Sequence, residues 1–338
     1  MMRSTFLLRS PRLFFVLLVG ILLGSILLAL NVGKYPLSPS QLWETISCSF
    51  SGQCEGNTEQ TVLWQIRLPR IFAACFVGAA LACAGATYQG MFKNPLVSPD
   101  ILGVSAGAGF GASLAIFYNL PMIYIQFFAF SGGILAVLCV SLIASRSRTQ
   151  DPILVLVLSG IAIGSLLGAG ISLLKILADP FTQLPSITFW LLGSLTAINQ
   201  QDLIQLIPIL LLGIVPIFLL RWRLNLLSLD EDEAQTLGVP IKRTRWILIV
   251  FTTLCTASAV AMTGIIGWVG LLVPHIARLL VGANFIRLLP TSLLLGASFL
   301  LLTDTLARTI APIELPLGIL TSACGAPFFL YLLVQGQK

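Results

Sequence analysis

Charged residues are scarce in this sequence. They make up 9% of its 338 residues, whereas ordinary soluble domains carry about 25%. Histidine occurs once, at His275, and the seven cysteines include no C-x-x-C pair, so the spacings that hold metal ions are missing. No G-x-x-x-x-G-K-[ST] motif and no grouping of a nucleophile with a base is found. These absences argue against a soluble domain, a metal site, an ATPase and an enzyme.

Long apolar runs are abundant instead. Hydrophobic residues account for 57% of the chain, and its mean hydropathy is +0.97. A helix needs about 20 predominantly apolar residues to cross a bilayer. We therefore predict an all-α integral membrane protein, one domain over 1–338 with about ten transmembrane helices, the first being a helix and not a cleaved signal. The predicted spans are 13–31, 69–90, 97–118, 122–145, 153–177, 203–220, 244–264, 269–283, 289–310 and 316–334.

The basic residues predict the orientation of the chain. Its net charge is +6, and with the N-terminus inside, fourteen of the 19 Lys and Arg residues fall in inner loops. Inner loops of membrane proteins carry the excess of Lys and Arg. We expect a bacterial inner-membrane protein with both termini in the cytoplasm. The positive charge follows these loops and gives no reason to expect nucleic-acid binding.

Small residues recur at four-residue intervals in several predicted spans. At helical pitch this spacing places them on one face, where two helix backbones can approach closely inside a bilayer. We predict tight helix packing at these positions and hence a dense bundle. The positions are Gly78 and Ala82, Gly103 and Gly107, and Gly160 and Gly164.

Two polar stretches are expected on the inner side. The first, 93–96, reads KNPL and predicts a tight turn between the second and third spans; such backbone must lie in protein, in water or along a cavity. The second, 224–245, is the least membrane-like part of the chain. Its acids Asp230 to Glu233 suit the first turn of a helix and Gly238 suits its end. We predict a short surface helix with an apolar face that needs a cover; a solvated loop is the alternative.

Three features are expected on the outer side. Residues 178–202 contain two prolines and predict a short interfacial helix with turns. Cys48 and Cys54 share the first outer loop, where an oxidising compartment would permit a disulfide, although free thiols fit equally well. Asp304 and Arg308 lie one helical turn apart near the outer end of the ninth span, which fits either an ion pair or a functional site.

A weak internal repeat relates the two halves. The stretch 82–103 resembles 261–282 in its placement of Gly and Pro, with unequal spacings. The predicted repeats are 67–178 and 244–335. Because an odd number of spans separates their starts, they would run in opposite directions, and inverted repeats are typical of transporters.

Several motifs in one order resemble a known family. They are RLPR (67–70), GAALACAGATYQGMFKNPLVSPDILGVSAGAG (78–109), LxxxEAxxLGV (229–239), GIIGWVGLLVPHIAR (264–278), DTLAR (304–308) and LPLGILTSACGAPFF (315–329). Together they are similar to the FecCD/BtuC-type permeases, the iron–siderophore, vitamin B12 and metal-chelate type of ABC importer permease. Within that family the sequence most resembles membrane subunits assigned to molybdate and tungstate.

The resemblance implies a type II importer permease that works in a complex. A second permease copy would complete the translocation path, two ATP-binding-cassette ATPases would dock inside with ATP and Mg, and a periplasmic binding protein would deliver substrate. No cofactor is implied in this chain itself. By position, the binding protein would meet Arg67, Arg70 and Arg308; the inner gate would be Asn94, Pro95 and Leu96; and the ATPase would dock on an inner segment (224–242), at Leu229, Asp230, Glu231, Ala234, Leu237 and Gly238.

Two positions depart from the family pattern. Asp230 stands where the family commonly has glycine, which makes the docking segment unusually acidic. The start of the fifth span, where B12-type members have small hydroxyl residues at a second gate, reads DPIL at 151–154. The identity of a gate there stays open, and an apolar constriction fits equally well.

We therefore predict a permease that moves a metal chelate or metal oxyanion from periplasm to cytoplasm by alternating access. Molybdate or tungstate is favoured, with iron–siderophore, haem and cobalamin as further candidates. An ion-coupled secondary transporter is the alternative from another class. Such carriers use intramembrane carboxylates; Asp304 is the only candidate here, and Arg308 beside it would hold it ionised. The sequence leaves open the substrate and whether the two permease copies are identical.

Overall fold

The computed structural model describes residues 11–51, 58–147, 152–229, 231–236, 238 and 240–335. Within these ranges the chain is helical and contains no strand. The helices are α1 (Pro11–Asn31), α2 (Pro39–Ser51), α3 (Thr58–Thr61), α4 (Leu68–Met91), α5 (Val104–Phe117), α6 (Met122–Arg146), α7 (Pro152–Leu177), α8 (Gln183–Leu191), α9 (Gln200–Leu219), α10 (Arg221–Leu227), α11 (Glu231–Thr236), α12 (Ile241–Thr263), α13 (Val269–Val281), α14 (Phe285–Thr309) and α15 (Leu317–Gln335), with a π-helix η2 (Val62–Arg67) and a 3₁₀-helix η3 (Pro99–Leu102).

This architecture confirms the predicted all-α membrane class. Each of the ten predicted spans coincides with a helix, and seven helical stretches of the described chain are long and apolar enough to cross a bilayer. The helices α5, α13 and α15 are shorter. A glycine with positive φ precedes both α5 and α13: Gly103, at 78°, separates η3 from α5, and Gly264, at 70°, ends α12. The two halves thus share a long helix, a turn and a short helix, while the inverted repeat itself stays a prediction.

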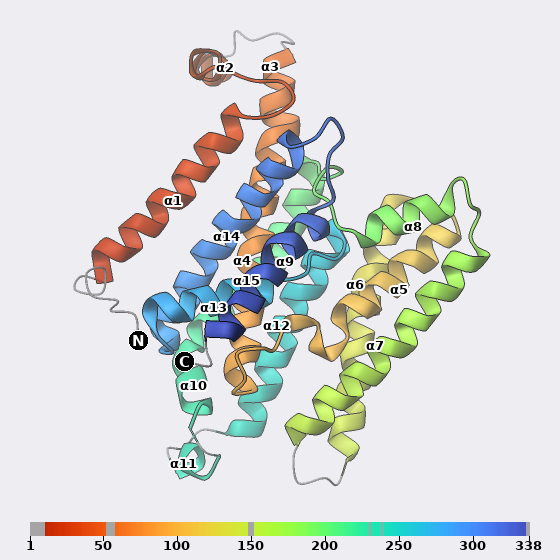
Figure 1. Cartoon of the computed structure of the whole chain (residues 1–338), viewed down its shortest axis with the longest axis vertical. Helices are drawn as coiled ribbons and strands as arrows, with labels where there is room; N and C mark the ends of the chain where they lie inside the picture. The colour runs from red at the N-terminus through yellow and green to blue at the C-terminus, as the bar shows by residue number, and fades with distance from the viewer. Residues whose placement is uncertain are drawn as a thin grey trace.

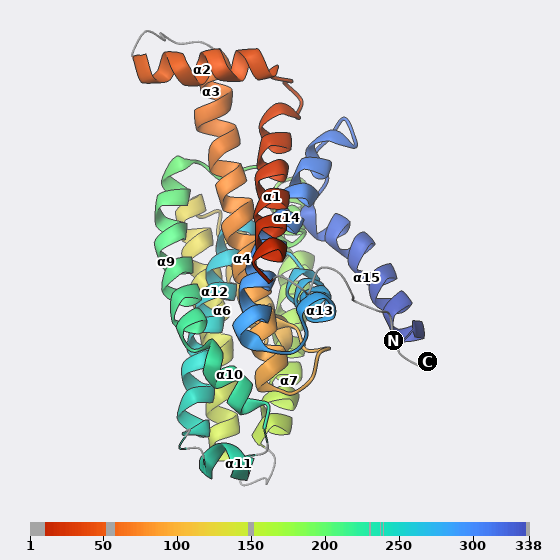
Figure 2. The same ribbon diagram turned by 90° about the vertical axis from the view of Figure 1, so that its left-hand side faces the viewer.

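Helix α4 is the centre of the bundle (Figure 1). It packs against α14, α13, α12 and α9, and most of its residues are buried. Figure 2 shows α2 lying across one end of the molecule and α11 at the other. On the far side from α1, α5 packs between α6 and α7, and α8 packs against α5.

Small residues bring these helix backbones into direct contact. A Cβ added at Gly78 would lie 2.2 Å from the carbonyl oxygen of Gly296, so α4 and α14 touch without a side chain between them. Ala82, one turn along α4, is fully buried in the same contact between α4 and α14. A Cβ at Gly107 would lie 2.3 Å from Gly132 O on α6, and one at Gly160 would lie 2.0 Å from Ile101 O. Only hydrogen fits at these three glycines.

The helical run that contains α4 begins earlier than predicted. The predicted span starts at residue 69, but continuous helix runs from Thr58 through η2 into α4. In a regular α-helix the ring of Pro69 would clash with the carbonyl four residues earlier. The wide π-helical turn lies directly before Pro69, and such turns commonly mark places where the regular ladder is interrupted. The sequence reasoning took the proline as the start of the helix.

The loops also contain helices. The segment 178–202 contains α8, which matches the short helix predicted there. The predicted inner surface helix over 229–238 corresponds to the shorter α11, and Gly238 beyond it has φ 78°, as suits a helix end. A further helix, α10, precedes it and was not predicted. It forms because Leu224 and Leu227 are buried against the bundle, which gives the segment an apolar face.

Candidate functional site

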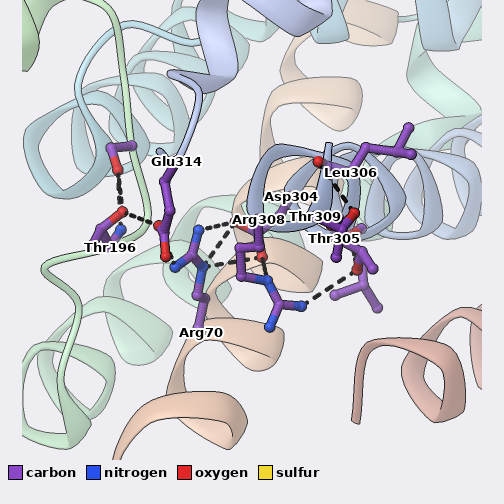
Figure 3. Close-up of polar contacts among 10 residues, drawn as sticks. Arg70, Thr196, Asp304, Thr305, Leu306, Arg308, Thr309 and Glu314 are labelled. Carbon is purple, nitrogen blue, oxygen red and sulfur yellow. Dashed lines mark hydrogen bonds and ion pairs between the residues drawn. The ribbon is translucent and has the colours of Figure 1, made fainter. Parts of the chain in front are cut away.

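A buried cluster of charges lies where α4, α14 and the loop 310–316 meet (Figure 3). Arg70 Nε donates to both carboxylate oxygens of Asp304, at 2.9 and 3.1 Å, and its Nη2 lies 2.8 Å from Asp304 Oδ1. Arg70 Nη1 donates to Glu314 Oε2 at 2.9 Å. One guanidinium therefore joins a carboxylate of α14 to a carboxylate of the following loop, with the forked geometry that favours arginine over lysine.

Arg308 completes this cluster from the other side of Asp304. Its Nε lies 3.3 Å from Asp304 Oδ2, one helical turn away, so the ion pair expected as one interpretation of these residues is present. Its Nη2 makes a long hydrogen bond, 3.4 Å, to Thr305 Oγ1. Asp304 is fully buried between the two arginines. An ionised carboxylate at this depth needs such partners, because an isolated buried charge is very costly.

Arg67 lies beside the cluster but has different partners. Its two terminal nitrogens donate to the backbone carbonyls of Leu30 and Tyr35, which tie α1 and the following loop to η2. Arg67, Arg70 and Arg308 are 3%, 6% and 7% exposed. The three arginines predicted to meet the binding protein are thus brought together but hold internal partners. Their docking role stays a prediction, and it requires these side chains to exchange partners.

Glu314 links this cluster to the start of α15. Thr196 Oγ1, in the loop between α8 and α9, donates to Glu314 Oε2 at 2.8 Å. The loop after α8 is also joined to the first turn of α15 by backbone bonds from Leu317 N to Gly193 O and from Gly318 N to Leu192 O. Burial alone would raise the pKa of the Glu314 carboxyl, but Arg70 and the Thr196 hydrogen bond outweigh it and hold this pKa below its usual value. The ionised Glu314 therefore ties the loop before α15 to α4 and to the loop between α8 and α9.

The predicted gate residues form a turn at the opposite end of α4. Asn94 Oδ1 accepts from Leu96 N at 2.9 Å, and Asn94 N donates to Gln89 O, which closes the turn around Pro95. Leu96 is 46% exposed. Lys93, in a left-handed conformation with φ 50°, donates its Nζ to the carbonyl of Leu229. The structure thus connects the predicted gate turn to Leu229, the first of the residues predicted to contact the ATPase.

The predicted docking segment packs on the end of the bundle opposite α2. Ala234 is fully buried in a cluster that contains Leu224, Leu227 and Leu248, so the apolar face of α11 is covered by its own chain. Leu229 is 37% exposed, and Glu231 is the first residue of α11. Asp230 and Leu237 lie outside the residues that the structure describes.

Asn225 on α10 fastens this segment to α14. Its Oδ1 accepts from Phe285 N at 2.8 Å, and its Nδ2 donates to Asn284 Oδ1 at 3.1 Å. Asn284 is the N-cap of α14 and also accepts from Ile286 N. A displacement of α10 and α11 would therefore act directly on the beginning of α14, whose other end holds Asp304 and Arg308.

Three of the residues that join these elements escaped sequence reasoning: Thr196, Asn225 and Glu314. A signal existed for Glu314, since it is the only acid between two prolines of the loop before the last span. Asn225 and Thr196 carry no such signal, because a single polar residue in a polar loop is ordinary. Cys48 is disulfide-bonded, but Cys54, its predicted partner, lies outside the described residues, so their pairing stays a prediction. Asp151, at the start of the fifth span, also lies outside them.

One predicted packing position faces no neighbour. A Cβ added at Gly164 on α7 would meet nothing within 4 Å, and the same holds for Gly168 one turn later. The Gly103 backbone lies beside Gly164 on its other side, since a Cβ at Gly103 would be 3.7 Å from Gly164 N. This part of α7 is close-packed on one side and open on the other.

Comparison with known proteins identifies the family. The model of the FecCD transport family matches residues 21–335. The chain belongs to this family. It is 40% identical over 322 residues, 94% of each chain, to the molybdate import system permease MolB of Haemophilus influenzae. It is 44% identical over 274 residues, 81% of this chain and 82% of the other, to an iron chelatin transport system permease of Helicobacter pylori.

A solved structure supports the same assignment. An inward-facing metal-chelate type ABC transporter matches with a TM-score of 0.86 and 39% identity, covering 96% of this chain and 100% of that one. The FecCD chain described here is therefore a multi-pass ABC importer permease for metal chelates or related substrates. It is not an enzyme, because ATP hydrolysis belongs to a separate subunit. The ion-coupled carrier considered as the alternative is thereby set aside.

Proposed function

We propose that this permease imports molybdate or tungstate, as the free oxyanion or as a chelate, from the periplasm to the cytoplasm. The observation that carries this substrate assignment is the 40% identity to the molybdate permease along 94% of both chains. The name of the similarly related Helicobacter pylori permease points to an iron chelate instead. The substrate must therefore be decided by direct measurement.

The complex we propose contains two copies of this chain, two ATPases inside and a binding protein outside. The open side of Gly164 and Gly168 on α7 favours a second copy or the path at this face. The gate function of Asn94, Pro95 and Leu96 is supported by their place in an exposed turn at the inner end of α4. The hydrogen bond from Lys93 to Leu229 gives a direct connection by which ATPase movement at 229–238 would reach that turn.

The substrate is tested on the whole importer. The permease, its ATPase and its binding protein are reconstituted in liposomes, and ATP hydrolysis and uptake are measured with molybdate, tungstate, sulfate and ferric siderophore. We expect molybdate and tungstate to stimulate both activities and sulfate to have little effect. Stimulation by ferric siderophore without a response to molybdate would overturn the substrate assignment and leave the permease assignment intact.

The docking segment is tested separately. Replacing the acids 230–233 by serine should release the ATPase or uncouple it from transport, measured by co-purification and by uptake per ATP hydrolysed. The matched control is Glu44→Gln, which removes an exposed acid from α2 at the opposite end of the molecule. Normal coupling in the serine variant would argue against this docking surface.

A further inference from the structure

A cavity of about 160 Å³ lies beside the buried charge cluster, between η2, α14 and the loop that follows α1. Its charged lining consists of Lys34, Arg67, Arg70, Arg308 and Glu314. Four cationic side chains therefore share this space with one carboxylate.

The carboxylates nearby do not balance these cations. Asp304 is shared by Arg70 and Arg308, and Glu314 pairs with Arg70. Arg67 has no carboxylate partner among the described residues, only the carbonyls of Leu30 and Tyr35. Arg67 is nevertheless 3% exposed. Because a buried cation without a counter-charge is costly, the arrangement calls for an anion.

The geometry places the donors for that anion around one point. A Cβ added to Gly33 would lie 3.0 Å from Arg67 Nη2 and 3.6 Å from Arg308 Nη1. Because both distances start from the same point, the two nitrogens are at most about 6.6 Å apart, the sum of 3.0 and 3.6 Å. Two oxygens of one oxyanion can bridge such a separation, each accepting from one guanidinium at about 2.9 Å. In Arg308, Nε pairs with Asp304 and Nη2 bonds to Thr305, whereas Nη1 is the atom that faces Gly33.

We propose that this cavity binds a small tetrahedral oxyanion, of the size of sulfate or phosphate, between Arg67 and Arg308 in the free permease. Forked guanidinium groups suit oxyanions, which accept two or more hydrogen bonds at once. The volume is sufficient for the ion and several waters, since one water needs about 10–15 Å³ by the same measure. The missing side chain of Gly33 provides the space. The site requires neither the binding protein nor the transported substrate, so it stands apart from the function proposed above.

The first test measures binding of [³⁵S]sulfate to the purified permease in phosphate-free detergent. We expect one saturable site per chain, weakened at least tenfold by Arg67→Gln and by Gly33→Ala. Gly33→Ala leaves every charge in place and adds a methyl group to the cavity beside Arg67 and Arg308. The φ of Gly33 is not in the left-handed region, so alanine can adopt its backbone conformation. Lys175→Gln, which removes a positive charge from α7, should bind as the wild type does. Unchanged sulfate affinity in Gly33→Ala, or no saturable site in the wild type, overturns the proposal.

The second test locates the ion in the wild-type protein and does not depend on the folding of a variant. Crystals soaked in selenate should give an anomalous selenium peak between Arg67 and Arg308; a well-resolved cavity without this peak overturns the proposal. The sulfate measurement is repeated in phospholipid nanodiscs to separate a free ion from a lipid phosphate. Binding retained there supports the free oxyanion, whereas binding seen only in detergent assigns the site to lipid and overturns the proposal as stated.

Discussion

Two helices of this permease carry the same small-residue spacing but have opposite surroundings. On α4, Gly78 presses against the Gly296 carbonyl so closely that an added Cβ would lie 2.2 Å from it. On α7, a Cβ at Gly164 or Gly168 would meet nothing within 4 Å. The spacing thus predicts that a helix face is smooth, and it does not predict what lies against that face.

The open face of α7 is informative because a side chain at either glycine would meet no atom of the described residues within 4 Å of its Cβ. Glycine in a helix interior costs about 1 kcal/mol relative to alanine, and a lipid-facing position would ordinarily carry a large apolar residue. Leu158, Ile161 and Leu166 on the same helix do so and are each more than half exposed. The two glycines therefore favour a surface that another backbone or the translocated substrate approaches. The packed half around α4 and the open half around α7 can be separated by mutation.

The largest effect is expected at Asp304 in the packed half. Asp304→Asn removes the carboxylate shared by Arg70 and Arg308 and leaves a buried cation without its partner. Breaking a buried pair in this way costs about 3–5 kcal/mol. Thermal unfolding of the purified protein should show a large drop in midpoint, whereas the exposed control Glu44→Gln should leave it unchanged. A midpoint near that of the wild type would show that the cluster does not stabilise the fold.

Gly78→Val should have the next largest effect. The added side chain meets the backbone of α14, which cannot yield as a flexible side chain would, and overpacking of this kind costs about 1–3 kcal/mol or more. The measurement is the unfolding midpoint and the yield of monodisperse protein, compared with Gly164→Ala as the matched small-residue change on α7. Gly164→Ala should be neutral or slightly stabilising. Equal losses of stability in the two variants would contradict the difference between the packed face of α4 and the open face of α7.

Gly164→Leu distinguishes fold from assembly in the open half. Since a Cβ at this position would meet no atom of the described residues within 4 Å, the stability of the single chain should not fall and should rise by at most about 1 kcal/mol from the loss of a helical glycine. If a second copy or the substrate path uses this face, the fraction of dimer or the uptake rate should fall several-fold. Dimer fraction is measured by mass photometry and uptake in liposomes. Wild-type values for both would remove α7 from the interface and from the path.

The smallest effect concerns Glu314, which joins Arg70 of α4 to Thr196 in the loop between α8 and α9. Its carboxyl has a lowered pKa in the folded protein, so its stabilisation is complete above the ordinary value of 4.5 and is lost as the pH falls through the folded value. Glu314 is partly exposed, which limits the effect to about 1 kcal/mol. Unfolding midpoints of wild type and Glu314→Gln should differ at pH 7, and the difference should shrink as the pH falls below 4.5. Parallel pH profiles would show that this carboxylate contributes nothing.

The fold was largely predictable because a bilayer leaves helices as the main way to bury a polar backbone. Apolar length and the positions of Gly and Pro therefore located the spans. The surroundings of the charged residues were less predictable. The spacing of Asp304 and Arg308 is local and indicated an ion pair. Arg70, which also pairs with Asp304, lies 234 positions away from it in the sequence. Pairing at that separation depends on how α4 and α14 cross, which no local pattern encodes. For the same reason, the hydrogen bond between Asn225 and the start of α14 could not be predicted from the sequence.

The π-helical turn η2 has a consequence for α3 and α2, which lie beyond it at one end of the molecule. An α-helix advances about 100° per residue, so removing one residue from a regular helix rotates everything beyond the deletion by that angle. A π-helical turn closes i→i+5 bonds and therefore holds an additional residue. Deleting one residue from Val62–Ile66 should let this turn revert to regular α-helix and leave the azimuth of α3 nearly unchanged. The segment Val62–Ile66 is thus a place in this helical run where the chain can lose a residue without turning the helices beyond it.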